Sequence, residues 1–255
     1  MYLLIIPIVL SLFLLFSRAR NLQKAPFQRG DRVLLITAHP DDETMFFSPT
    51  IISLIRASIP VSILCLSNGG AYGLGSVREK EMMEACKELK VPEDNVIILD
   101  HPDLQDGMKT SWPEELVAQQ VYNAVTKYKA NQVVTFDKKG VSGHINHVGA
   151  HKGVRRYMTD RQYRSAHGTV QCFELVSTSL FRKFSGLMDL PVSSLFLGSN
   201  CKLVVNPFPG VTTKAMSKHK SQRTWYRHLF TLMSRYTMMN TLRKMERSQY
   251  GYMSS

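Results

Sequence analysis

The sequence has few cysteines, and none at the spacing that commonly binds zinc. Only four of its 255 residues are cysteine, and no two form a C-x-x-C pair. This excludes a disulfide-rich scaffold and a Cys-rich zinc module, and it favours a reduced, cytosol-facing domain. Repeats and low-complexity tracts are also missing, while 44% of the residues are apolar. The chain is therefore expected to fold as one α/β domain, or at most two small ones.

Two phosphate-binding motifs are absent as well. The glycine-rich stretch 68–75 lacks the G-x-G-x-x-G spacing, and no G-K-S or G-K-T triplet occurs. Those arrangements place backbone amides around a nucleotide phosphate. Their absence argues against a nucleotide-binding or scaffold module. A nucleotide-binding or scaffold module remains the alternative to a metallohydrolase, and measuring the metal content would distinguish the two.

Acidic residues are nearly missing from both ends of the chain. The net charge is +12, of which residues 1–30 carry +4, residues 202–255 carry +9 and the part between carries −1. A nucleic-acid enzyme more often places its positive charge along a central groove. Basic ends on a nearly neutral middle favour contact with an anionic membrane surface and no nucleic-acid partner.

The stretch 1–16 contains no charged residue, and Arg18 and Arg20 follow it. Sixteen helical residues span about 24 Å, slightly less than the ~27–30 Å of a bilayer core. Because the basic residues come after the apolar run, we expect an uncleaved anchor at 1–20, a linker at 21–30 and a cytosol-facing domain at 31–255. A cleaved signal peptide and a buried helix are the alternatives.

Apolar runs rich in β-branched residues alternate with amphipathic stretches over most of the chain. They predict strands at 33–38, 61–66, 96–99, 132–136 and 172–176, and helices at 43–57, 77–89, 113–129 and 146–157. This alternation indicates an α/β fold with a Rossmann-like, mostly parallel sheet and flanking helices, preceded by one N-terminal transmembrane helix. Ligands of such sheets bind beyond the carboxyl ends of the strands.

Polar side chains gather where the first predicted strand ends. His39, Asp41 and Asp42 follow it directly, and the turn at Pro40 allows His39 and Asp42 to converge. A helix N-cap is the simpler interpretation of either aspartate alone. The histidine beside two aspartates favours a site instead.

The fourth predicted strand is followed by three histidines within eight residues, His144, His147 and His151. Nitrogen and oxygen ligands without a thiolate favour Zn²⁺ and leave Mn²⁺ and Fe²⁺ open. The sequence therefore predicts a divalent metal site between the first and fourth strands, which are expected to be neighbours.

Several short runs together resemble a known family. They are Ala-His-Pro-Asp-Asp-Glu at 38–43, Leu-Ser-Asn-Gly-Gly at 66–70, Arg-Glu at 78–79, Asp-Gly at 106–107, Gly-His-Ile-Asn-His at 143–147 and His-Lys-Ser-Gln at 219–222. The first resembles the zinc-dependent sugar N-deacetylases, and the whole of 31–245 is similar to the eukaryotic N-acetylglucosaminyl-phosphatidylinositol de-N-acetylases. The resemblance implies a single-pass endoplasmic reticulum enzyme that removes acetate from this glycolipid in the second step of glycosylphosphatidylinositol anchor synthesis.

The resemblance also implies roles for single residues. His39, Asp42 and His147 would hold the metal, Asp41 would act as general base, and His144 would stabilise the oxyanion or protonate the amine. For substrate binding it implies Arg78, on the inositol or phosphate, and Asn146.

The chain departs from bacterial relatives at two positions. Asn146 stands where they often have aspartate, so the tuning of His144 is expected to differ. Ser142 stands where they have a tyrosine, so no oxyanion role is carried over to that position. Another amide hydrolase with a soluble N-acetyl-sugar substrate remains the alternative function.

Two further segments have open interpretations. Residues 178–200 mix apolar residues with Arg182 and Lys183, which suits an ordinary helix and loop or a surface that enters the bilayer interface. Residues 221–247 repeat apolar residues every three or four positions among arginines, which predicts a basic amphipathic helix. We expect that helix to contact either the membrane or the sheet.

Overall fold

The computed structural model describes residues 27–163, 170–206, 209–222 and 224–246. Its centre is a sheet of order β3-β2-β1-β4-β5-β7-β6. The strands are β1 Val33–Thr37, β2 Val61–Cys65, β3 Val96–Ile98, β4 Gln132–Phe136, β5 Gln171–Leu175, β6 Cys201–Val205 and β7 Met239–Lys244. The first five are parallel, whereas β7 runs antiparallel to both β5 and β6. The predicted mostly parallel α/β sheet is thereby confirmed.

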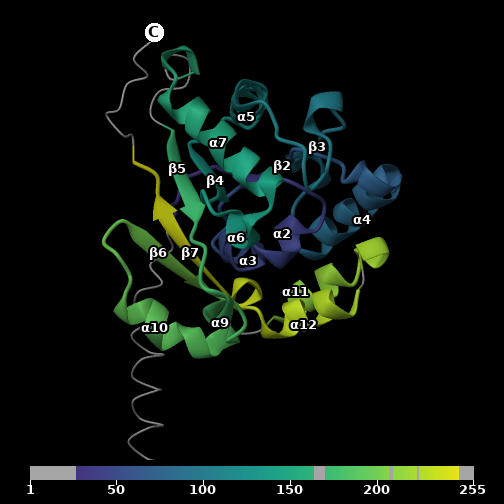
Figure 1. The fold of residues 1–255 in the computed structure, drawn as a ribbon. Coiled ribbons are helices and arrows are strands. Elements are labelled where there is room, and N and C mark those ends of the chain that lie inside the picture. Colours follow the sequence, from purple (N-terminus) through teal and green to yellow (C-terminus); the bar gives the residue numbers. More distant parts are fainter. Residues whose placement is uncertain (1–26, 164–169, 207–208, 223, 247–255) are drawn as a thin grey trace, which may run out of the picture.

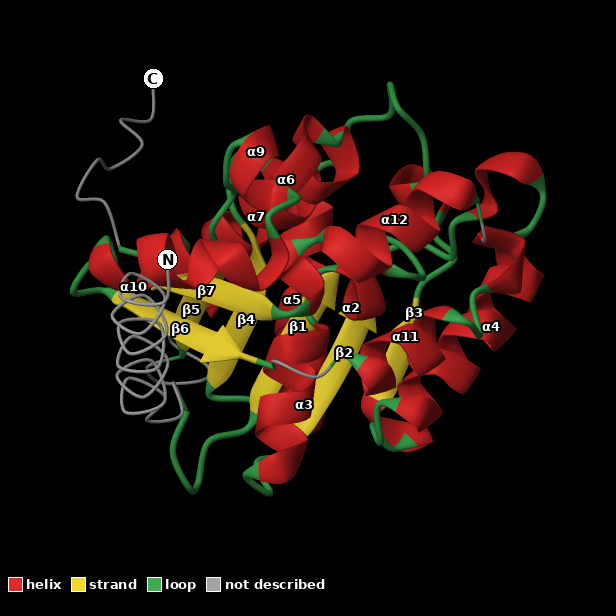
Figure 2. Ribbon diagram, turned by 90° about the horizontal axis from the view of Figure 1, so that it is seen from below, coloured by secondary structure: helices red, strands yellow, loops and turns green. Residues whose placement is uncertain are grey.

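Helices cover both faces of this sheet (Figures 1 and 2). The chain moves outward from β1 to β3 and then in the opposite direction from β4 to β5. Because such crossovers are right-handed, α3 (Ser48–Arg56) and α4 (Gly75–Glu88) cover one face, and α5 (Glu114–Tyr128) and α7 (Ile145–Thr159) cover the other. Strands β1, β2 and β4 are buried along their whole length, which explains their continuous apolar sequences.

Shorter helices complete the described chain. They are α2 Asp42–Met45, α6 Gly140–Gly143, α9 Leu180–Lys183, α10 Leu190–Leu195, α11 Gly210–Met216 and α12 Trp225–Met233. Six 3-10 turns accompany them: η1 Gly70–Tyr72, η2 Glu93–Asn95, η3 Pro102–Leu104, η4 Gly186–Asp189, η5 Lys220–Gln222 and η6 Arg235–Thr237. The predicted helix at 43–57 is two helices, α2 and α3, separated by the buried Phe46 and Phe47.

The prediction of one amphipathic helix over 221–247 is wrong. Within this segment only α12 is an α-helix, and the chain continues through the 3-10 turn η6 into strand β7. Tyr236 and Met239, two of the apolar residues in the repeat that predicted this helix, are both fully buried. Packing into the sheet overrides the helical periodicity here, because β7 fills the position between β5 and β6.

The predicted anchor at residues 1–20 lies outside the described residues, as does most of the predicted linker. Among the helices that are described, none has the length and apolarity needed to cross a bilayer. Phe27, at the start of the described chain, is buried against Phe173 of β5, with the ring centres 5.5 Å apart.

Candidate metal and catalytic site

The site lies at the carboxyl ends of β1 and β4, which are paired neighbours. The chain leaves β1 in one direction across the sheet and β4 in the other, so the loops that follow these strands separate and leave a crevice. The turn 38–41 follows β1, and the segment 137–144 with the first turn of α7 follows β4. Residues far apart in the sequence, such as His39 and His144, are brought together in this way.

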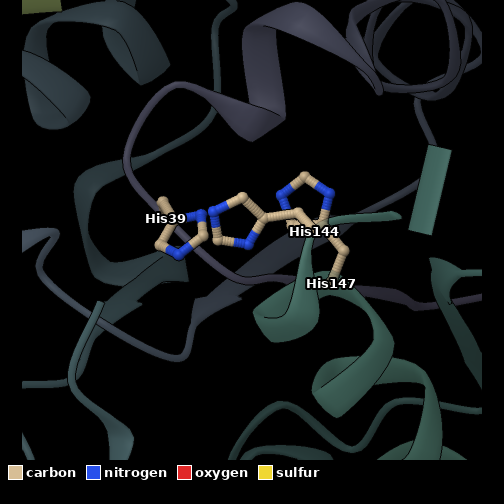
Figure 3. Close-up of side chains that lie close together, drawn as sticks. All are labelled: His39, His144 and His147. Carbon is tan, nitrogen blue, oxygen red and sulfur yellow. The ribbon is translucent and has the colours of Figure 1, made fainter. Parts of the chain in front are cut away.

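Three of the predicted site histidines form a cluster. His39, His144 and His147 each offer a ring nitrogen, and these atoms all lie within 4.8 Å of one another. Figure 3 shows the three imidazole rings side by side, His39 from the turn after β1 and the other two from the start of α7. His39 and His147 are almost fully buried, whereas His144 is partly open to solvent.

Asp42 approaches the same cluster with one carboxylate oxygen. Its Oδ2 accepts hydrogen bonds from the backbone amides of Ala38 and His39, at 2.9 and 2.8 Å. Its Oδ1 lies 3.2 Å from Nε2 of His147. Burial alone would raise the pKa of Asp42, but His147 and His39 hold the pKa well below its usual value. The carboxylate is therefore ionised and fixed in orientation.

His147 is oriented by the backbone on its other side. Its Nδ1 lies 3.0 Å from the carbonyl oxygen of Gly140, so Nδ1 carries the proton that is donated and Nε2 keeps a lone pair. That lone pair and Asp42 Oδ1 are two acceptors 3.2 Å apart, which requires a proton or a cation between them. Ligands at ~2.0–2.2 Å in a tetrahedral zinc site lie about 3.3–3.5 Å apart. The donor set therefore fits a divalent ion.

His144 presents a hydrogen-bond donor to the site. As the N-cap of α7 its Nδ1 accepts the amide of Asn146 at 3.3 Å, so the neutral ring carries its proton on Nε2. Burial, and then the nearby His39 and His147, lower the pKa of His144 to about 4. The ring is therefore neutral near pH 7, which suits hydrogen-bond donation to a developing oxyanion.

Asp41 is held in a strained backbone conformation, with φ of 120°. Its amide donates to Oε2 of Glu43 at 3.0 Å, and its Oδ2 lies 3.1 Å from Nη1 of Arg227. Burial raises the pKa of Asp41 more than Arg227 lowers it. A non-glycine residue at such a φ costs on the order of 1–3 kcal/mol and is typical of functional sites. A raised carboxylate pKa suits proton acceptance.

Arg78 and Asn146 lie beside the cluster but bind the protein itself. The Arg78 guanidinium donates to the carbonyls of Gly69 and Pro40 and to Asp106. The Asn146 side chain accepts from the amide of Gly107 and lies 3.0 Å from His39 Nε2. Both side chains join separate loops around the site. Their predicted contact with substrate remains a prediction, as do the other assigned roles.

His151, the third histidine after β4, lies outside the cluster. Its Nδ1 lies 3.1 Å from the carbonyl oxygen of Phe136 and 3.4 Å from Glu174 on β5. His151 follows His147 by one helical turn, but it lies beside the Phe136 carbonyl and Glu174 and not at the cluster. Burial lowers the pKa of His151.

Three side chains that the sequence did not single out also reach the site. Asp106 Oδ1 lies 3.2 Å from His39 Nε2. Arg227 of α12 pairs with Asp41. His219 lies 2.7 Å from Glu43 with both groups fully buried. Asp106 and His219 stand in runs that carry the family resemblance, which was the signal available, whereas Arg227 stands in no motif.

Comparisons with known proteins agree with this geometry. A family model described as PIG-L: GlcNAc-PI de-N-acetylase matches residues 34–158. The N-acetylglucosaminyl-phosphatidylinositol de-N-acetylase of Bos taurus is 38% identical over 213 residues, covering 84% of this chain and 83% of that protein. A probable enzyme of the same name from Schizosaccharomyces pombe is 37% identical over 222 residues, covering 84% and 87%.

The fold is shared more widely than the sequence. The N,N'-diacetylchitobiose deacetylase of Pyrococcus horikoshii superposes with a TM-score of 0.64 at 16% identity, over 90% of this chain and 89% of that one. At so low a sequence identity, the superposition shows a common fold and nothing more. The family follows from the curated relatives: the chain belongs to the N-acetylglucosaminyl-phosphatidylinositol de-N-acetylase family.

Proposed function

We propose that the chain hydrolyses the N-acetyl group of N-acetylglucosaminyl-phosphatidylinositol, giving glucosaminyl-phosphatidylinositol and acetate in glycosylphosphatidylinositol anchor synthesis. The observation that carries this proposal is the 38% identity to the bovine enzyme across most of both chains. The cluster of His39, His144, His147 and Asp42 supports it, because acetamide hydrolysis at a metal centre needs nitrogen and oxygen ligands of this kind.

Within that proposal, His39, Asp42 and His147 hold a divalent ion, with Zn²⁺ preferred and Mn²⁺ or Fe²⁺ compatible with the same ligands. Such an ion supplies a Lewis acid for the amide carbonyl and lowers the pKa of water to ~7. The thiols of Cys65 and Cys86 take no part, since burial raises the pKa of both well above the usual value.

The remaining chemistry belongs to two side chains. Asp41 accepts a proton from the attacking water as the new bond to the acetyl carbon forms. His144 donates a hydrogen bond from Nε2 to the carbonyl oxygen while negative charge develops there. When the carbon–nitrogen bond breaks, a proton passes to the sugar nitrogen, which leaves as a primary amine. Arg78 contacts the inositol or phosphate part of the substrate, and Asn146 contributes to substrate binding.

The site of action follows from the sequence. The uncharged segment at the N-terminus, with basic residues after it, supports a single-pass anchor at 1–20 and a cytosolic catalytic domain. The family resemblance supports a location in the endoplasmic reticulum membrane, and the basic ends support contact with an anionic membrane surface.

The test is acetate release by the purified full chain from N-acetylglucosaminyl-phosphatidylinositol in vesicles. One acetate is expected per glucosaminyl lipid formed. Chelation should abolish the activity, and added Zn²⁺ should restore it. Full activity in a preparation shown to be metal-free would refute the metallohydrolase. Release from soluble N-acetyl-sugars alone would refute the glycolipid substrate.

A further inference from the structure

Exposed apolar side chains gather on one side of the molecule. Of the sixteen large apolar residues that are exposed in the described part of the chain, twelve lie in two segments, 180–196 and 225–233. Phe181, Phe196 and Trp225 are 87%, 81% and 75% exposed. The segments form α9, η4, α10 and α12, and these helices lie together along the lower side of Figure 1. We call this surface the α9–α12 face.

The α9–α12 face is one continuous and firmly held surface. Phe184, after α9, packs edge-on against Phe230 of α12, with ring centres 6.0 Å apart. Asp189, at the start of α10, binds Arg182 of α9 at 2.6 Å and the buried Arg235 at 2.9 Å. These ion pairs fix the helices to one another. The apolar side chains are therefore held outward by a rigid support.

The same face adjoins the candidate site. Arg227 extends from α12 to Asp41. Phe230, one turn further along α12, packs against Phe46, and Phe46 packs against His147, with ring centres 5.5 Å apart in both contacts. Phe230, on the buried side of α12, is thus two packing contacts away from the histidine cluster.

Charge decides between a lipid and a protein occupant. The two segments that form the face, 180–196 and 225–233, contain three lysines and arginines and only one acid, and that acid is Asp189, which is buried in the ion pairs described above. Lys183 lies over the rings of Phe184 and Phe230, at 5.9 and 5.5 Å. Protruding apolar side chains with basic groups between them fit the acyl and phosphate layers of an anionic bilayer.

We propose that the α9–α12 face inserts its apolar side chains into the interface of an anionic bilayer. This contact holds the site at the depth of the lipid headgroups. The placement of the site at headgroup depth rests on the proposed function, because it assumes that the substrate is a membrane lipid. The insertion of the face into the bilayer does not depend on that function. An anchor at the N-terminus confines the domain near a membrane, whereas this face determines which side of the domain meets it.

Trp225 provides a direct probe, because the chain contains only two tryptophans and the other, Trp112, is buried. The full chain is placed in phosphatidylserine-containing vesicles made with or without brominated acyl chains. We expect bromine to quench the wild type and to leave Trp225→Phe unchanged. As a matched control, Tyr128→Trp is added to Trp225→Phe. Tyr128 is the last residue of α5, and α5 lies in the upper part of Figure 1, away from the α9–α12 face. A tryptophan at this position should therefore not be quenched.

Two outcomes would overturn the proposal. Quenching of Trp225 by aqueous iodide but not by bromine would show that the face is in water. Protection from both quenchers, with a particle mass of two chains, would show that a second copy covers it.

Activity provides an independent readout. Phe181→Ser combined with Leu195→Ser should lower turnover of the glycolipid in vesicles by about tenfold. Turnover of the lipid-free headgroup, N-acetylglucosaminyl-inositol phosphate, should stay unchanged. Tyr128→Ser should change neither rate. An equal loss on both substrates would mean that the double substitution damages the fold. If the wild type acts on neither substrate, the proposed function fails, while the quenching experiment still tests the face.

Discussion

Asp41 and Asp42 are adjacent and chemically identical, yet the structure gives them different surroundings. Asp42 is ionised and directed at His147, whereas burial raises the pKa of Asp41, which pairs with Arg227. Asp42→Ala should therefore lose metal and activity together. Asp41→Asn should keep its metal while turnover falls about 10²–10⁴-fold, because the side chain can no longer accept a proton.

Metal content measured beside turnover checks both variants. His147→Ala should behave like Asp42→Ala, and His144→Ala like Asp41→Asn. If Asp41→Asn lost the metal and Asp42→Ala retained it, the two roles would have to be exchanged.

Gly140 has a second function besides forming a turn. Its φ is +56°, and a Cβ there would stand 2.8 Å from the Cβ of His147. Gly143 has a φ of +76° but open space around it. Gly140→Ala and Gly143→Ala should share a backbone cost of roughly 1–2 kcal/mol. Only Gly140→Ala should also weaken metal binding, because it displaces His147.

Metal affinity and thermal stability of the two alanine variants separate these effects. Equal metal affinity in both would show that the Gly140 turn does not position His147.

The residues that could be predicted from the sequence share a local cause. His39, Asp41 and Asp42 follow one buried strand, His144 and His147 follow another, and parallel neighbours bring their ends together. Arg227 could not be found in this way. Arg227 lies on a helix 186 positions after Asp41, and nothing near Arg227 in the sequence indicates that the two residues are in contact.

At the scale of elements, the loop after α11 supports the turn that carries Asp41. Burial lowers the pKa of His219, but Glu43 at 2.7 Å more than offsets this, so the pKa lies above its usual value. Protonated His219 therefore stabilises the fold below about pH 6.5, and this contribution disappears as the pH rises through the folded-state pKa. His219→Gln should cost about 1–3 kcal/mol at pH 6 and progressively less in alkaline solution.

Urea unfolding in detergent, from pH 6 into the alkaline range, measures the difference in unfolding free energy between His219→Gln and the wild type. Lys220→Gln, an exposed neighbour, should show the wild-type pH dependence. A deficit for His219→Gln that grows with pH would mean that the neutral imidazole is the stabilising form.

The core strands were predictable because burial on both faces demands continuous apolar sequences. Strand β7 was not. Its Asn240 is fully buried, where it donates to the carbonyl of Phe46 and accepts from Thr50. A buried polar residue near the start of the strand hides the alternating pattern, and Trp225, Leu229 and Leu232 on α12 supply a competing helical one. The long-range hydrogen bonds that settle the matter are not visible in local sequence.

At the scale of the whole molecule, charge order predicts the orientation. The apolar segment precedes the first basic residues, so the domain from residue 31 onward should face the cytosol. A glycosylation acceptor engineered near residue 255 should stay unmodified in cells, while the same acceptor placed before Met1 on a short extension should be modified. Efficient glycosylation near residue 255 would show that the predicted topology is wrong.

The strand order also sets a sequence of events during synthesis. Strand β6 pairs only with β7 in the described sheet, and β7 is the last of the described strands to be made. At about 5–20 residues per second, residues 206–238 take a few seconds to synthesise. Throughout that interval β6, with Leu203 and Val204, has no strand to pair with, and Asp41 lacks its partner Arg227. The β6–β7 edge and the Arg227 contact with Asp41 therefore form last, and chaperones that bind unpaired strands have a defined window in which to act.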